Sequence, residues 1–431
     1  MNLRAQPAVD AALREHLRRE YADVRACSQC LAEPLTPEDQ GVQSMPDTSP
    51  TKWHLAHTTW FFEALVLMPM APGYAPYDPR FLELFNSYYE SLGPRHPRPQ
   101  RGVLSRPDIA EVSAYRAHVD ARIAEFLASA PSGVFAAAAP VIGLGLHHEQ
   151  QHQELMLTDI KHAFSCNPLH PAYSAATLAA ESEDLPLTWT HYAGGLVEIG
   201  HGVEGFAFDN ESPRHKVWLE PYDLASRPVT CGEYLRFIED GGYQRPEFWL
   251  SDGWACVRAE QWEAPLYWRR TADARDTHYR VFTLHGDCPL DPAAPVCHLS
   301  FYEAQAYAAW AGARLPSEFE WEHAAAPLPV EHRHAPDHLH PRLQSASNVM
   351  MHAMFGEVWE WTQSAYAPYP GFRPWAGPAA EYNGKFMVNQ LVLRGGSCVT
   401  PPGHLRATYR NFFPASARWQ FSGVRLARDP L

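Results

Sequence analysis

Two histidines four residues apart are the first feature of this sequence that could perform chemistry. They are His148 and His152, in the stretch Gly145-Leu-His-His-Glu-Gln-Gln-His-Gln-Glu-Leu-Met-Leu-Thr-Asp159. On an α-helix this spacing places both side chains on one face, so two imidazoles can meet one metal ion. Polar side chains crowd the other sides of this helix, which is typical of a helix that lines a site. The alternative is an exposed polar helix with chance histidines, because such pairs are common.

A bundle of helices is the element expected to position this pair. The apolar pattern predicts long helices over about 10–30, 49–63, 108–129 and 140–164, and a shorter one over 81–89. Ser49 and the segment Ser105-Arg-Pro-Asp108 supply capping residues for two of them. Four helices over about 165 residues indicate a four-helix bundle, whose metal ligands come from more than one helix. A third ligand is therefore expected from the second helix, where His54 and His57 are both candidates.

The composition favours a globular protein of two domains. The chain has 431 residues, of which 46% are hydrophobic and 19% charged. Its formal net charge of −14 argues against nucleic acid or an anionic membrane as a partner. The sequence contains no transmembrane run or signal-peptide pattern, and its eight cysteines are scattered, so we expect a cytoplasmic, reduced protein.

The character of the sequence changes between residues 166 and 187, where prolines and the acidic run Glu181-Ser-Glu-Asp184 are typical of a linker. We therefore expect a four-helix bundle over residues 1–165, a linker over 166–187 and a second domain over 188–431. The second domain has short apolar runs between turn residues, which predicts an α+β fold. Its expected strands lie near Val197, Val217 and Leu391, and its expected helices span 230–239 and 300–311.

Several phrases of the second half are distinctive in combination. They are Arg314-Leu-Pro-Ser-Glu-Phe-Glu-Trp-Glu322, Gly356-Glu-Val-Trp-Glu-Trp-Thr362, Leu393-Arg-Gly-Gly-Ser397, Arg406-Ala-Thr-Tyr-Arg-Asn-Phe-Phe413 and Gly423-Val-Arg-Leu-Ala427. Each alone is explained as a loop corner that glycine, tryptophan or arginine fixes. Together they resemble the formylglycine-generating-enzyme-like sulfatase-modifying domain, a C-type-lectin-like fold. The first half, with WHLAH, FNSYYESLG and HHEQQHQE, resembles a DinB-like bundle. Both halves in this order resemble the EgtB-type ergothioneine-biosynthesis sulfoxide synthases, over nearly the whole chain.

The resemblance implies a non-haem Fe(II) held by three histidines in a cleft where the two domains meet. Carried over by motif, the ligands are His57, His148 and His152, and His54 is a neighbour of the ligands. Enzymes of this family use O2 to join a thiol to the imidazole C2 of Nα-trimethylhistidine (hercynine), and they oxidise the new sulfur to a sulfoxide. Neutral imidazoles suit Fe(II), and three on one side leave open positions for O2 and the substrates.

Two neighbouring tyrosines, Tyr88 and Tyr89, are expected to matter for mechanism. In the family members that this chain resembles most, a tyrosine of this pair lies near the iron and can supply a proton or a hydrogen atom. The alternative is a buried aromatic pair that only packs, in which case Tyr382 or a bound water is the next candidate.

The remaining site predictions concern substrate binding. The trimethylammonium group of hercynine has no N–H to donate, so aromatic faces are expected to bind it. Phe412, Phe413 and Trp419 are available for this, and Asn411 or Gln151 could hold the imidazole or carboxylate. Arginines of the basic, proline-rich segment 94–106 could bind a co-substrate carboxylate with two hydrogen bonds. These arginines are Arg95, Arg98 and Arg101.

The thiol donor is predicted from one position at which this sequence departs from the pattern of some relatives. Relatives that use γ-glutamylcysteine tend to carry Asn-Trp-Asp where this chain has Asn411-Phe412-Phe413. The missing acid would have met the ammonium of that dipeptide, so its absence favours L-cysteine over γ-glutamylcysteine.

Other functions remain open from the residues. A DinB-type thiol transferase would leave the second domain unexplained. A formylglycine-generating oxidase needs a cysteine pair near the C-terminus, where only Cys398 stands. A lectin-like binding module stabilised by a structural metal would usually supply four protein ligands.

Overall fold

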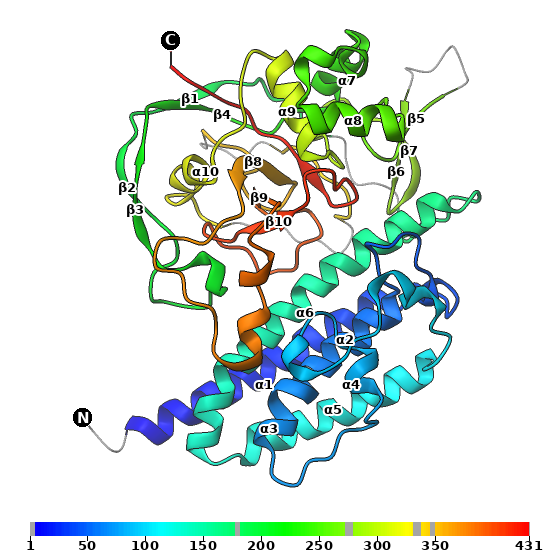
Figure 1. The fold of residues 1–431 in the computed structure, drawn as a ribbon, viewed down its shortest axis with the longest axis vertical. Helices are drawn as coiled ribbons and strands as arrows, with labels where there is room; N and C mark the ends of the chain where they lie inside the picture. Colours follow the sequence, from blue (N-terminus) through cyan, green and yellow to red (C-terminus); the bar gives the residue numbers. More distant parts are fainter. Residues whose placement is uncertain (1–4, 177–181, 272–278, 331–337, 345–349, 431) are drawn as a thin grey trace. The chain divides into compact units, whose positions relative to one another are not determined.

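The computed structural model describes residues 5–176, 182–271, 279–330, 338–344 and 350–430. The chain forms two compact units. The first holds Met1–Cys166 together with Trp375–Tyr382, and the second holds Asn167–Pro374 and Asn383–Leu431 (Figure 1). Of the expected linker, residues 177–181 lie outside the described part. The grouping of Trp375–Tyr382 with the helical unit differs from a simple division of the sequence near residue 166.

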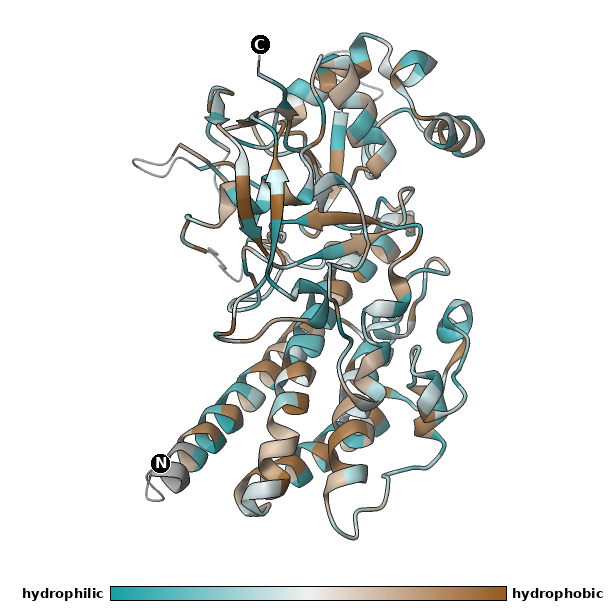
Figure 2. Cartoon of the chain, turned by 60° about the vertical axis from the view of Figure 1, so that its left-hand side comes forward, coloured by the Kyte–Doolittle hydropathy of each residue, from teal (hydrophilic) through white to brown (hydrophobic). Residues whose placement is uncertain are grey.

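The helical unit is built mainly from α1, α2, α5 and α6. In this unit α1 packs against α6, and α2 packs against both α5 and α6. Hydrophobic and hydrophilic residues alternate along these helices, as bundle packing requires (Figure 2). A π-helical segment, Glu63–Leu67, connects α2 to α3. The helices are α1 (Ala5–Ala32), α2 (Thr51–Phe62), α3 (Met68–Met70), α4 (Phe81–Leu84), α5 (Ile109–Ser129) and α6 (Ser132–Cys166).

The helix beginnings correct two sequence predictions and confirm one. Ser49 does not cap α2, because Pro50 occupies the N-cap position and the Ser49 hydroxyl accepts from Arg101 at 2.9 Å. The cap expected from the segment Ser105-Arg-Pro-Asp108 is confirmed, since Asp108 caps α5 by accepting from the Glu111 N–H. Helix α6 begins eight residues before Pro140, since the alanines that precede the proline are strong helix formers.

The short helix predicted over 81–89 begins at Phe81 as expected, but its predicted end is wrong, because α4 ends at Leu84. Asn86 explains the early end. Its side chain donates to the Tyr89 carbonyl at 2.9 Å and accepts from the Tyr89 N–H at 3.0 Å. Local side-chain bonds of this kind compete with helical ones.

A buried ion network holds the helices of the first unit together. The Glu149 carboxylate on α6 accepts from Arg25 at 2.9 Å, Arg116 at 3.0 Å and Ser28 at 2.6 Å. Arg25 and Ser28 belong to α1 and Arg116 to α5, so one carboxylate joins three helices. Glu149 and both arginines are buried.

The second unit contains short helices and small sheets. Its sheets have the strand orders β10-β9-β8-β11, β1-β4-β12, β5-β6-β7 and β2-β3, and β11 runs parallel to β8. The helices are α7 (Cys231–Glu239), α8 (Ser251–Glu260), α9 (Phe301–Trp310) and α10 (Glu318–Ala325). The strands are β1 (Trp189–Tyr192), β2 (Gly195–Ile199), β3 (His215–Leu219), β4 (Tyr222–Ala225), β5 (Trp268–Arg270), β6 (Tyr279–Thr283), β7 (Gly286–Pro289), β8 (Trp359–Ala365), β9 (Leu391–Arg394), β10 (Asn411–Phe413), β11 (Ser422–Gly423) and β12 (Ala427–Arg428).

Helix and strand positions in this unit confirm the sequence predictions, because the helices expected over 230–239 and 300–311 are α7 and α9. Thr230 and Ser300 each form a capping box with the glutamate three residues later, at the starts of α7 and α9. The strands expected near Val197, Val217 and Leu391 are β2, β3 and β9. The predicted fold class, a helical bundle followed by an α+β domain, is confirmed.

The distinctive phrases of the second half meet as buried ion pairs. Arg410 pairs with Glu318 at 2.8 Å, Arg425 pairs with Glu360 at 2.8 Å, and Arg394 bonds to Glu322. Each pair joins two of the phrases, so these residues hold the core rather than only shaping loop corners. Across the described residues, no helix is both long enough and apolar enough to cross a membrane.

Candidate metal centre

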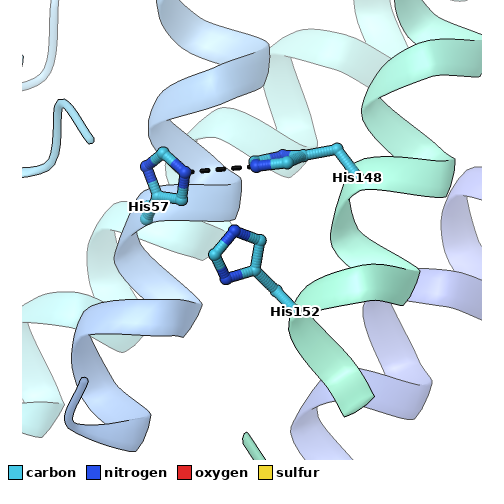
Figure 3. A group of neighbouring side chains, drawn as sticks. All are labelled: His57, His148 and His152. Atoms are coloured by element: carbon cyan, nitrogen blue, oxygen red, sulfur yellow. Dashed lines mark hydrogen bonds between the residues drawn. The ribbon is translucent and has the colours of Figure 1, made fainter. Parts of the chain in front are cut away.

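Three histidines of the helical unit meet at one point. His57 comes from α2, and His148 and His152 come from consecutive turns of α6 (Figure 3). Their candidate ligand atoms all lie within 4.8 Å of one another. The Nε2 atoms of His57 and His148 are 3.1 Å apart. Three nitrogen atoms this close can bind a single metal ion, as the spacing of His148 and His152 predicted for two of them.

The surroundings keep these rings neutral. Burial lowers the pKa of His148 to about 3, although the nearby Glu149 opposes the shift. Burial also holds the pKa values of His57 and His152 well below their ordinary range, with His148 adding to the effect. Neutral rings have a nitrogen lone pair at neutral pH, which a metal ligand needs. His57 and His148 are buried, whereas His152 is partly exposed.

The orientation of His57 is fixed on three sides. Its Nδ1 lies 2.6 Å from the carbonyl oxygen of Phe85. A carbonyl can only accept, so Nδ1 carries the hydrogen and Nε2 keeps its lone pair. The ring also lies between two tryptophans, with centroids 4.6 Å from Trp53 and 5.5 Å from Trp60 and near-parallel planes. The early end of α4 is what exposes the Phe85 carbonyl to His57.

His54 lies beside the cluster, with both ring nitrogens engaged elsewhere. Its Nδ1 is 2.7 Å from Nδ1 of His152, and its Nε2 is 3.0 Å from the Asp159 carboxylate. A histidine with both nitrogens in hydrogen bonds has no lone pair left for a metal. This geometry fits the expectation that His54 is a neighbour of the ligands.

Most of the chain matches known protein families. Residues 188–334 and 337–430 match the model of the sulfatase-modifying factor enzyme 1-like domain, and residues 20–156 match the DinB superfamily. The hercynine oxygenase of Mycobacterium tuberculosis is 34% identical over 409 residues, which cover 89% of this chain and 92% of that protein. The chain belongs to the hercynine oxygenase family. The hercynine oxygenase of Mycolicibacterium smegmatis is 33% identical, over 90% of this chain and 92% of its own length. The formylglycine-generating enzyme of Streptomyces coelicolor is 27% identical over 52% of this chain.

In this member of the hercynine oxygenase family, the tyrosine pair is linked to the histidines through Trp60. The rings of Tyr88 and Tyr89 are 4.7 Å apart and nearly parallel. Tyr89 is fully buried, and its ring centroid lies 5.4 Å from that of Trp60. Trp60 in turn stacks on His57. Burial holds the pKa of Tyr89 well above its ordinary range, and Tyr88 and Tyr382 add to the effect, so its hydroxyl stays protonated.

Tyr382 reaches the cluster from the segment Trp375–Tyr382. Its ring lies 5.8 Å from that of His148 and 6.5 Å from that of Tyr88. Its hydroxyl donates to the side-chain oxygen of Gln151, which belongs to α6. The next residue back, Glu381, accepts from the backbone N–H groups of Glu90 and Ser91 at 3.0 and 2.9 Å.

The three candidate arginines have different environments. Arg101 is buried over the Trp53 ring, 3.3 Å from its centroid, and donates to Ser49 and Ser87. Arg95 is exposed and pairs with Glu90 at 3.2 Å. Arg98 is exposed and donates to the backbone carbonyl of Asp47. Of the three, Arg101 is the one that the structure links to the histidines, through Trp53.

The other expected substrate-binding residues lie in the second unit. Phe412 stacks on Tyr366, with centroids 4.0 Å apart, and Phe413 meets Trp419 edge-on at 5.6 Å. The Asn411 side chain accepts from the Phe412 N–H at 2.9 Å. These residues form an aromatic group around strand β10.

Two contributors were missed by sequence reasoning. The carbonyl of Phe85 carries no sequence signal, because any residue supplies one. Glu381 also has no recognisable signal in the sequence, because the backbone groups that it binds lie about 290 residues away.

Proposed function

We propose that this protein is an Fe(II)- and O2-dependent sulfoxide synthase of ergothioneine biosynthesis. It would join the imidazole C2 of hercynine to a thiol, most favourably L-cysteine, and oxidise the new sulfur to a sulfoxide. The observation that carries the proposal is the meeting of His57, His148 and His152 in a chain of the hercynine oxygenase family. The name of the relatives supports hercynine as the substrate and O2 as the oxidant.

The donor set fits Fe(II). Three neutral nitrogen donors on one side of an ion leave positions for a thiolate, an imidazole and O2. A structural zinc site usually has four protein ligands, and the part of the chain that the structure describes supplies three at this point. When bound, the iron would activate O2 beside the two substrates. The protein would hold the carbon and the sulfur close together, so that their reaction is effectively unimolecular.

The direct test combines metal analysis with oxygen uptake. The purified chain loaded with Fe(II) should consume O2 when hercynine and cysteine are both present, and mass spectrometry should find the coupled sulfoxide. Zinc-only binding and no oxygen uptake would favour the lectin-like binding module instead. Coupling only with γ-glutamylcysteine would keep the reaction and change the thiol.

The choice of thiol is a prediction in its own right. We expect kcat/KM to be about 10-fold or more higher for L-cysteine than for γ-glutamylcysteine, because a charged hydrogen bond to the dipeptide ammonium is missing. The change Phe413→Asp should shift this ratio towards the dipeptide. Phe413→Leu is the matched control, since it shortens the side chain without adding a charge. A wild-type preference for γ-glutamylcysteine would contradict the prediction.

The tyrosine pair should control the outcome of O2 activation. A positioned phenol can deliver a proton that favours carbon–sulfur coupling over plain thiol oxidation, an effect of about 10²-fold or more. Tyr88→Phe, Tyr89→Phe or the double change should therefore move the product from sulfoxide towards oxidised cysteine, such as the sulfinic acid. Hercynine affinity should change little, because the ring is retained.

Product analysis at saturating substrates measures this shift. Tyr74→Phe is the control, because it removes a tyrosine hydroxyl of the same unit that bonds to Glu63 at 2.6 Å. If the pair variants keep the full sulfoxide yield and Tyr382→Phe loses it, the proton donor is Tyr382, whose ring contacts His148.

A further inference from the structure

A chain of hydrogen bonds leads from a buried carboxylate to one of the three histidines. The Asp159 carboxylate lies 3.0 Å from Nε2 of His54, and Nδ1 of His54 lies 2.7 Å from Nδ1 of His152. The same carboxylate oxygen also accepts from the Ser49 N–H at 2.8 Å. Asp159 is 5% exposed and His54 is 2% exposed, so water competes little with these bonds.

One arrangement of hydrogens satisfies the chain and leaves a metal ligand at its end. A carboxylate only accepts, so His54 carries its hydrogen on Nε2. A neutral His54 then presents a bare Nδ1, which accepts the hydrogen on Nδ1 of His152. His152 consequently keeps the lone pair of its Nε2. The reverse arrangement, in which His54 donates from Nδ1, would put the His152 hydrogen on Nε2 and block that atom.

We propose that His54 and Asp159 are positioning residues that set the tautomer of His152 and hold its Nε2 ready for the metal. The inference rests on the proposed metal centre. A carboxylate behind an imidazole fixes the ring and raises the basicity of the ligating nitrogen. His57 receives comparable support from the Phe85 carbonyl, whereas Nδ1 of His148 has no hydrogen-bond partner among the described residues.

A purely structural role for the same residues is the alternative. Asp159 also fastens the chain before α2 to α6, through the Ser49 N–H. Loss of that bond alone would lower the melting temperature but would change neither the tautomer of His152 nor the metal affinity of the folded protein. These two quantities therefore separate the roles.

The experiment uses the full chain with and without Co(II), a spectroscopic substitute for Fe(II). Long-range ¹H–¹⁵N correlation on histidine-labelled, metal-free protein reads the tautomer of His152. Titration of the Co(II) absorption bands gives the affinity. His54→Leu removes the acceptor, whereas His54→Asn keeps a side-chain oxygen near the position of Nδ1. Asp120→Asn is the control for Asp159→Asn, because Asp120 is also a hydrogen-bonded carboxylate of the bundle, bound to Tyr21 and Arg25.

Wild-type protein should show the His152 hydrogen on Nδ1. His54→Leu should mix the two tautomers and weaken Co(II) binding by about 10- to 100-fold. His54→Asn should recover most of the affinity, Asp159→Asn should lose less than His54→Leu, and Asp120→Asn should bind Co(II) as the wild type does.

The inference is overturned if wild-type His152 carries its hydrogen on Nε2, or if folded His54→Leu keeps the wild-type tautomer and affinity. Should His54→Leu fail to fold, Asp159→Asn decides, since unchanged affinity and an unchanged His152 tautomer in that variant would reject the role. Failure of the proposed function looks different: Co(II) would bind tightly, with the His152 tautomer as predicted, but the iron-loaded protein would not turn over hercynine.

Discussion

Replacement of His57, His148 or His152 by alanine should abolish turnover and remove most of the bound iron. Each ring supplies one of the three nitrogen atoms that lie within 4.8 Å of one another. Two imidazoles hold a divalent ion poorly, so the Fe(II) affinity should fall by more than the roughly 100-fold that loss of a supporting residue causes. Anaerobic Fe(II) titration and the yield of sulfoxide measure the two effects.

His162→Ala is the matched control for these variants. His162 lies on the same helix, α6, but its Nδ1 bonds to Ser44 at 2.7 Å and it is not part of the cluster. Iron content and turnover should therefore stay close to those of the wild type. If His57→Ala kept its iron and His54→Ala lost it, the assignment of the third ligand would be wrong, and His54 would take that place.

The hydrophobic periodicity and the residue types at helix ends were enough to predict much of the fold. The spacing of His148 and His152 needed only a continuous helix, and α6 runs unbroken from Ser132 to Cys166. The helices predicted from Thr230 and Ser300 begin with capping boxes, which depend on residues three positions apart, so a short sequence window contains the signal for these helix starts.

Predictions failed where a distant or competing partner decides the structure. The helix over 81–89 was shortened by the bonds of Asn86 to Tyr89, and the Ser49 hydroxyl was diverted from capping by Arg101, 52 residues away. Residue types alone left His54 and His57 equivalent as candidates. What separates them in the structure is Asp159 on one side and the Phe85 carbonyl on the other. Sequence spacing does hint at the first of these, because Asp159 is seven residues after His152 and so lies on the same helix face.

Glu149→Gln should have the second large effect, which is a loss of stability of the helical unit. Burial alone would raise the pKa of this carboxyl, but Arg25 and Arg116 lower it to about 2 from an ordinary value of 4.5. That difference corresponds to about 3 kcal/mol at neutral pH. Removing one member of a buried ion network typically costs about 3–5 kcal/mol, because the partner charges stay buried without compensation. The two values agree, and they predict a drop in melting temperature of roughly 6 to 20 °C for a unit of this size.

The lowered pKa of Glu149 also predicts how the stability of the helical unit depends on pH. A carboxyl whose pKa is lowered by folding stabilises the protein above the pKa of the unfolded chain, and it loses that contribution as the pH falls through the folded value. Wild-type helical structure should therefore lose stability between about pH 4.5 and pH 2, and Glu149→Gln should lose less over that range.

Thermal melting followed by circular dichroism at 222 nm measures both results. Glu15→Gln is the control, because Glu15 also bonds to an arginine of the bundle, Arg18, but on an exposed helix face, where such pairs contribute little. Equal melting temperatures for Glu149→Gln and Glu15→Gln would show that the network around Glu149 does not hold the helical unit together. Tight packing of α1, α5 and α6 would then have to account for the placement of His148, the residue next to Glu149.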